Sequence, residues 1–192
     1  AAERFHVKHV VSVNSWTSGL VAAMGAIGLE PGDEVIVTPW TMVATATAIL
    51  QWNAIPVFAD IDPLTFNIDP KAVEAAITPR TRAIAAVDIF GQSADMPALR
   101  AIADRHGLKL VTDTAQAPGA LIDGVPAGST ADIGGFSLNY HKHIHCGEGG
   151  LLVTNNDHLA ERYENKRNTH GKPDIIFSDI SRLWHVASTL LN

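Results

Sequence analysis

The stretch RAIAAVDIFGQSADMPALRAIADRHGLKLVTD, residues 82–113, decides the fold of this chain. Arg82 to Val87 is an apolar run of strand length, and Met96 to His106 carries apolar residues at helical spacing until Gly107 ends the pattern. A second apolar run follows from Leu108 to Thr112. In neither run do apolar and polar residues alternate, whereas they do alternate in strands that have one solvated face. The stretch therefore predicts two parallel strands joined by a helix, in a sheet covered on both faces.

Strand and helix patterns alternate along the rest of the chain as well. The expected strands are Val7 to Val13, Glu34 to Thr38, Ile55 to Ala59, Ala131 to Ser137 and Gly150 to Thr154. The expected helices are a helix end at Ala1 to Phe5, then Ser18 to Leu29, Thr41 to Gln51, Pro70 to Ala76 and Asp157 to Arg167. This alternation predicts an α/β fold with three layers, α/β/α, around a mostly parallel central sheet.

Composition narrows the range of partners. Hydrophobic residues make up 46% of the 192, the formal net charge is −6 and no basic run is present, so a nucleic-acid partner is not expected. No apolar stretch approaches the ~20 residues of a membrane-spanning helix, so no membrane partner is expected either. Cys146 is the only cysteine, which excludes an internal disulfide and fits the cytoplasm. Both ends read as interrupted elements, and we expect a piece of a longer protein.

Polar residues follow the strands at the edge where ligands of parallel sheets bind. Asn14 to Gly19 opens a helix with hydroxyl groups and free backbone amides, which suits an anion such as a phosphate. The alternative is an ordinary helix cap. Asp113 follows a buried strand, where a carboxylate needs a cation or hydrogen-bond donors. It is either an acid paired with a protonated ring nitrogen or a cap for the next segment.

A lysine follows the strand that ends at Ser137. The Ser137 hydroxyl could contact a phosphate, and Lys142 lies between His141 and His143 on the same loop. Partial burial beside other cations turns a lysine into a nucleophile towards carbonyls. The alternative is a solvated side chain. The glycine-rich residues 147–150 suit a turn that fixes this loop.

In this order and spacing, the motifs resemble the DegT/StrS-type sugar aminotransferases, a branch of the fold-type I (aspartate aminotransferase-like) enzymes. The likeness runs from about Val7 to Gly171. The series of motifs is specific to this family, although no single motif is. The segments that carry it are residues 14–18 (NSWTS), 31–37 (PGDEVIV), 43–46 (VATA), 56–62 (PVFADID), 67–70 (NIDP), 91–96 (GQSADM), 113–117 (DTAQA), 142–144 (KHI) and 147–150 (GEGG).

The resemblance implies a pyridoxal 5′-phosphate cofactor. In that family the loop lysine binds the cofactor covalently, and Lys142 stands in its place as the catalytic residue. Asp113 matches the acid that pairs with the pyridine nitrogen, and Gln116 matches a glutamine near the ring hydroxyl. The other implied cofactor contacts are Thr17, Ser137 and the backbone of Trp16 at the phosphate, and Met42, which stands where many members place an aromatic ring over the cofactor.

The implied reaction is a ping-pong transfer of an amino group from an amino acid, typically glutamate, to a nucleotide-linked keto-deoxysugar. Such reactions serve lipopolysaccharide, O-antigen or secondary-metabolite sugar biosynthesis. The family builds its site with groups from a second subunit, so a homodimer is expected. Relatives with histidine in place of Lys142 act as sugar dehydratases, and other relatives are non-catalytic sensors. The presence of Lys142 together with Asp113 and Gln116 favours transamination.

Trp16 departs from the family, which most often has a small residue there, and is expected to reshape the phosphate site. Residues 1–171 are expected to form the cofactor-binding large domain, incomplete at its N-terminus. Residues 172–192 read as a tail of unassigned structure, and the smaller C-terminal domain is expected to be absent.

Other kinds of site have weaker support in the sequence. His141, His143 and His145 alternate like ligands on a strand, but no cysteine or carboxylate pair completes a metal site. Cys146 has a possible base only in the adjacent His145, which rarely gives the geometry a nucleophile needs. No Gly-x-Gly-x-x-Gly motif follows the first strand. We therefore expect no metal.

Overall fold

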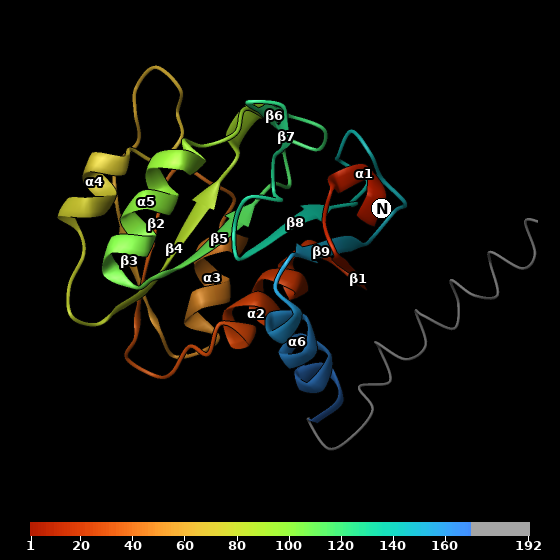
Figure 1. Ribbon diagram of the computed structural model, residues 1–192, viewed down its shortest axis with the longest axis horizontal. Coiled ribbons are helices and arrows are strands. Elements are labelled where there is room, and N and C mark those ends of the chain that lie inside the picture. The colour runs from red at the N-terminus through yellow and green to blue at the C-terminus, as the bar shows by residue number, and fades with distance from the viewer. Residues whose placement is uncertain (170–192) are drawn as a thin grey trace, which may run out of the picture.

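A seven-stranded sheet forms the centre of the protein in the computed structural model, which describes residues 1–169 (Figure 1). Neighbouring strands from β8 to β3 are parallel, whereas β9 runs antiparallel to both of its neighbours, β8 and β1. One strand therefore opposes the other six, and the mostly parallel sheet is confirmed. In spatial order the strands are β1 (His9–Val13), β9 (Gly150–Thr154), β8 (Ile133–Ser137), β5 (Lys109–Asp113), β4 (Thr81–Val87), β2 (Glu34–Val37) and β3 (Ile55–Phe58).

Helices cover both faces of the sheet, because successive strand residues point to opposite sides. Val35 and Val37 pack in one core with α2 (Trp16–Ala26), α3 (Ala44–Leu50) and α6 (Asp157–Thr169). Ile36, which lies between them, packs in a second core with α4 (Pro70–Ala75) and α5 (Met96–His106). All four residues of β2 are buried. The three-layer α/β/α arrangement is therefore confirmed.

Side-chain caps explain where the helices begin. The Ser15 hydroxyl accepts a hydrogen bond from the backbone N–H of Ser18 (3.2 Å), so α2 begins at Trp16, two residues before the expected start. Asp69 caps α4 and Asp95 caps α5 in the same way. The expected helix α6 is confirmed.

A small hairpin was not expected from the sequence. It consists of β6 (Leu121–Ile122) and β7 (Val125–Pro126). Asp123 and Gly124 join the two strands, with φ of 50° and 78°. A tight two-residue hairpin turn requires such positive φ values, and the Asp-Gly pair was the signal that could have revealed it. Two short elements complete the chain order, α1 (Ala2–Phe5) and the 3-10 turn η1 (Ile89–Gly91).

None of the helices among residues 1–169 is long and apolar enough to cross a membrane. The expected tail, residues 172–192, lies outside the described part of the chain.

Candidate active site

The ends of three strands bring the sequence motifs to one edge of the sheet. Ser137 at the end of β8 pairs with Gly150 at the start of β9, and Gly150 pairs in turn with Val13 at the end of β1. Across β8, Gly135 pairs with Asp113, the last residue of β5. The helix start after Val13, the acid, and the loop from β8 to β9 therefore all leave the sheet at its carboxyl edge, where the sequence predicted a site.

Asp113 is a buried carboxylate, 5% exposed, and three segments donate to it. Its Oδ1 accepts hydrogen bonds from the indole Nε1 of Trp16 (2.8 Å) and the backbone N–H of Ala115 (3.2 Å). Its Oδ2 accepts one from the hydroxyl of Thr45 in α3 (2.7 Å). Each carboxylate oxygen has two lone pairs. Oδ2 therefore keeps one acceptor position beyond its partner among the described residues.

By accepting the hydrogen bond from Ala115, Asp113 caps the segment that follows it, which is one of the two roles that the sequence left open. The other two donors come from distant parts of the chain, 97 residues away for Trp16 and 68 for Thr45. Neither contact was expected from the sequence, because only the tertiary fold brings these segments to the end of β5. Asp113 thus acts as the meeting point of α2, α3 and the sheet.

The indole of Trp16 points inwards and is 3% exposed. Two glycines make room for it: a Cβ added to Gly135 would lie 2.0 Å from its Cζ3, and a Cβ added to Gly19 would lie 2.5 Å from its Cε3. Both distances are far below any carbon–carbon contact. The sequence pointed to the Trp16 backbone; the structure adds the buried side chain.

The start of α2 has features both of an anion site and of an ordinary helix cap, the two alternatives that the sequence left open. Ser15 is the helix cap, and its hydroxyl also lies 3.0 Å from the hydroxyl of Ser18. Thr17 is exposed in the first turn. The first backbone amides of a helix attract anions whether or not a side chain caps one of them.

Asn139 organises the lysine loop, residues 138–149. Its carbonyl accepts a hydrogen bond from the N–H of Lys142 (2.9 Å), and its side-chain oxygen accepts one from the N–H of His141 (3.1 Å). Its side-chain amide donates to the carboxylate of Glu148. Asn139 was not expected to have this role, although asparagine side chains commonly bond to nearby backbone in turns.

Lys142 is half-buried within this loop, whereas His141 and His143 are exposed. The loop is closed at its base by the N–H of Leu138, which donates to the carbonyl of Gly149 (2.9 Å). The lysine is therefore carried on a bonded turn next to the paired ends of β8 and β9.

Ser137 and Gln116 each accept a hydrogen bond from a backbone N–H, and each side chain also carries a donor. The Ser137 side chain accepts from the N–H of Asn139 (3.3 Å), which leaves its own hydroxyl proton to be donated. The Gln116 side-chain oxygen accepts from the N–H of Phe90 (3.1 Å), so its amide NH₂ remains the donating end. Ser137 ends β8 and Gln116 follows β5, so both lie at the carboxyl edge of the sheet.

Met42 is 60% exposed in the segment between β2 and α3. Its sulfur accepts a hydrogen bond from the N–H of Ala44 (3.2 Å), a weak interaction for a thioether. The sulfur therefore contacts the backbone at the start of α3.

A second buried acid, Asp88, follows β4 and was missed in the sequence. Its Oδ2 accepts from the hydroxyl of Thr114 (2.7 Å) and its Oδ1 from the N–H of Ala94 (2.9 Å), while its own N–H donates to the carbonyl of Asp113 (3.0 Å). Burial raises the pKa of the Asp88 carboxyl above its usual range, and these hydrogen bonds oppose the rise. Asp88 thus ties the loops after β4 and β5 together.

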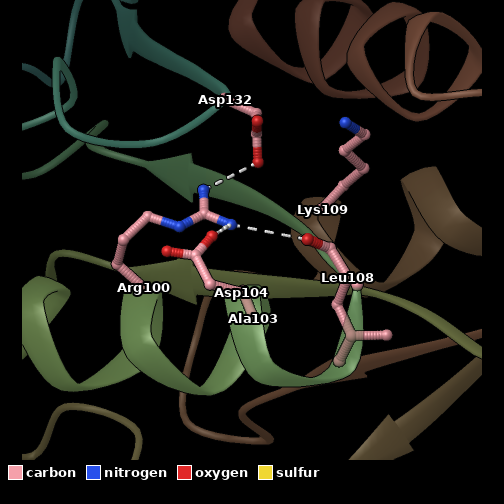
Figure 2. A pocket seen from close by; sticks show the side chains of 7 residues that line it. Arg100, Ala103, Asp104, Leu108, Lys109 and Asp132 are labelled. Carbon is pink, nitrogen blue, oxygen red and sulfur yellow. Dashed lines mark hydrogen bonds and ion pairs between the residues drawn. The ribbon is translucent and has the colours of Figure 1, made fainter.

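A polar hollow lies at the opposite, amino edge of β5 (Figure 2). Arg100 of α5 forms ion pairs there with Asp104 (2.9 Å) and Asp132 (2.9 Å), and donates to the carbonyl of Leu108 (3.4 Å). Since two carboxylates already pair with this guanidinium, we assign the hollow no chemistry. In the part of the chain that the structure describes, no three His, Cys, Asp or Glu side chains are grouped to hold a metal ion.

Known proteins are similar to this chain in sequence and in structure. The chain is 48% identical to the L-glutamine:2-deoxy-scyllo-inosose aminotransferase of Streptoalloteichus tenebrarius, over 84% of this chain and 38% of that protein. The structure of this chain is similar to that of DesI, which was solved in the presence of the TDP-sugar product of DesI. The TM-score is 0.84, and the identity is 40% over 91% of this chain and 43% of DesI. The structure also matches NtdA of Bacillus subtilis, solved with bound cofactor PMP, with a TM-score of 0.80 and 34% identity over 91% and 41%.

The chain thus spans less than half the length of these relatives. The DegT/DnrJ/EryC1/StrS aminotransferase family matches it over residues 1–185, a range that extends at both ends beyond the likeness expected from about Val7 to Gly171. The resemblance predicted from the motifs is therefore confirmed, and the chain belongs to the DegT/DnrJ/EryC1/StrS aminotransferase family.

Proposed function

We propose that the protein is a pyridoxal-phosphate-dependent aminotransferase that moves an amino group from an amino acid to a keto sugar. The observation that carries the proposal is the lysine loop. Lys142 lies on the loop between β8 and β9, which leaves the same edge of the sheet as the buried carboxylate of Asp113. Family membership supports the same conclusion, because its relatives include enzymes named as aminotransferases.

The residues at this edge fit pyridoxal phosphate. Oδ2 of Asp113 keeps one acceptor position, which suits the protonated ring nitrogen. The Ser137 hydroxyl proton and the first backbone amides of α2 suit the phosphate. The amide NH₂ of Gln116 suits the ring hydroxyl.

Lys142 is the catalytic residue in this proposal. Its amine would hold the cofactor covalently, and the same amine would move a proton at the substrate carbon. When bound, the cofactor would supply an electron sink for the charge that this proton leaves behind. Asp113 would hold the proton of the ring nitrogen, and the hydrogen bonds that Asn139 accepts from the N–H groups of Lys142 and His141 fix the turn that carries the lysine.

The names of the relatives support a choice of substrates. One is named for L-glutamine and 2-deoxy-scyllo-inosose, and another was solved with a TDP-sugar product. We propose glutamate or glutamine as the amino donor and a nucleotide-linked keto sugar as the acceptor. We further propose that the complete protein is a cytoplasmic homodimer whose second subunit completes the substrate pocket.

Reduction with borohydride tests the role of Lys142 in the complete protein. After loading with pyridoxal phosphate, reduction should leave a stable cofactor label on the peptide that contains Lys142, identified by mass spectrometry. Lys142→Ala should lose the label, the visible absorbance and transamination, while Lys71→Ala, at an exposed position on α4, should keep all three. A wild-type protein that stays colourless and unlabelled would contradict the proposed function.

A further inference from the structure

Trp16 donates a hydrogen bond to the acid that the proposed function places against the cofactor. We propose that Trp16 is a positioning residue, whose indole N–H holds the Asp113 carboxylate so that the open side of Oδ2 faces the ring nitrogen of pyridoxal phosphate. The inference rests on the proposed function. It assigns the Trp16 side chain a role beyond the backbone contact that the family resemblance implied.

The hydrogen bonds of Asp113 determine which oxygen stays open. Trp16 and Ala115 donate to Oδ1 and occupy both of its lone pairs. Thr45 occupies one lone pair of Oδ2. Without the indole N–H, the carboxylate could turn about its Cβ–Cγ bond, and either oxygen could meet the ligand. Trp16 therefore selects one orientation.

The donor itself is rigid. The indole is buried against Gly19 and Gly135, and a single methyl group at either glycine would overlap with its ring. Its N–H is therefore directed at Asp113 before any ligand binds. A group that is already fixed loses little conformational entropy when it forms its hydrogen bonds.

The donors are also neutral. Trp16 and Thr45 stabilise the carboxylate by hydrogen bonding without adding a positive charge beside it. An arginine or lysine in their place would pair with the acid and compete with a cationic ring nitrogen. The arrangement leaves the negative charge of Asp113 for the ligand.

The test compares Trp16→Phe with Trp52→Phe in the complete protein. Trp16→Phe keeps a ring in the slot and removes the N–H. Trp52→Phe removes an indole N–H that donates instead to the carbonyl of Val21 (2.7 Å). We expect Trp16→Phe to weaken pyridoxal phosphate binding about tenfold, the loss typical of one hydrogen bond to a charged group. Trp52→Phe should leave the dissociation constant unchanged.

A spectroscopic measurement separates positioning from packing. In Trp16→Phe, the visible band of the lysine-bound cofactor should titrate at a higher pH than in the wild type. A displaced acid holds the positive charge on the ring nitrogen less firmly, so the nitrogen shared with Lys142 takes up a proton more readily. In Trp52→Phe the band should titrate as in the wild type. Wild-type binding and titration in Trp16→Phe would overturn the inference.

The cofactor-free protein gives an independent readout. By NMR, the indole N–H of Trp16 should exchange slowly with solvent, and exchange should become fast in Asp113→Ala. If exchange is fast in the wild type, the hydrogen bond and the inference both fail. If exchange is slow but the wild type takes up no pyridoxal phosphate, the proposed function fails and the positioning role with it. If the wild type binds the cofactor and Trp16→Phe behaves like it, the inference alone fails.

Discussion

At the scale of single residues, the site depends on a charge that is buried among neutral donors. Asp113 is 5% exposed, and hydrogen bonds from Trp16, Thr45 and Ala115 replace the water it has lost. Removing one donor from a buried carboxylate costs more than removing a bond between neutral groups, because the charge keeps its desolvation penalty.

Thr45→Val should therefore destabilise the protein by about 1–3 kcal/mol, measured by chemical denaturation of the cofactor-free form. The substitution keeps the shape of the side chain and removes the hydroxyl that donates to Asp113. Thr47→Val is the matched control in the same helix, since its hydroxyl donates only to the nearby carbonyl of Ala44 (3.2 Å) among the described residues. An equal loss of stability in both variants would show that the bond from Thr45 to Asp113 contributes no more than the bond from Thr47 to Ala44.

At the scale of elements, the lysine loop depends on one asparagine more than on buried contacts. Asn139 bonds to the backbone of Lys142 and His141 and to the carboxylate of Glu148. Most of the loop between its ends is exposed, so hydrogen bonds rather than apolar packing hold its conformation. Such a loop can be disturbed with little effect on the core.

Asn139→Ala should thus leave the melting temperature nearly unchanged but weaken pyridoxal phosphate binding several-fold, because the turn that carries Lys142 loses its side-chain bonds. Absorbance titration with pyridoxal phosphate measures the change in binding. Asn155→Ala is the control, since Asn155 also accepts a backbone hydrogen bond, from Lys8 (2.9 Å), but lies after β9. Unchanged binding in Asn139→Ala would show that the loop is fixed by other contacts.

At the scale of the whole molecule, the two edges of the sheet have different roles. The carboxyl edge gathers the candidate active site. At the amino edge, Glu34 of β2 accepts hydrogen bonds from the hydroxyl of Thr78 and from the Nε of Arg80 (2.9 Å). The bond from Thr78 lowers the pKa of the Glu34 carboxyl below its usual 4.5, and Arg80 adds to this against the opposing effect of burial. These contacts join the chain before β4 to the start of β2.

A lowered pKa means that the folded state binds the proton of Glu34 more weakly than the unfolded chain does. The stabilisation is therefore complete above the unfolded pKa and is lost as the pH falls through the lowered folded value. Glu34→Gln should melt at a lower temperature than the wild type at pH 7, and the difference should shrink as the pH falls below about 4. Glu30→Gln, at an exposed position, is the control. A difference that is independent of pH would contradict this account.

The sequence by itself determined the α/β class, the order of the main helices and strands, the carboxyl edge as the place of the candidate site, and Lys142 and Asp113 as its candidate residues. Apolar runs without alternation, helix breakers and motif order are local signals, so they can be read along the chain. Only the tertiary structure decided that Trp16 and Thr45 meet at Asp113 and that Gly135 makes room for an indole from α2. These contacts join segments far apart in the sequence, and their partners are set by how the layers pack rather than by any periodicity.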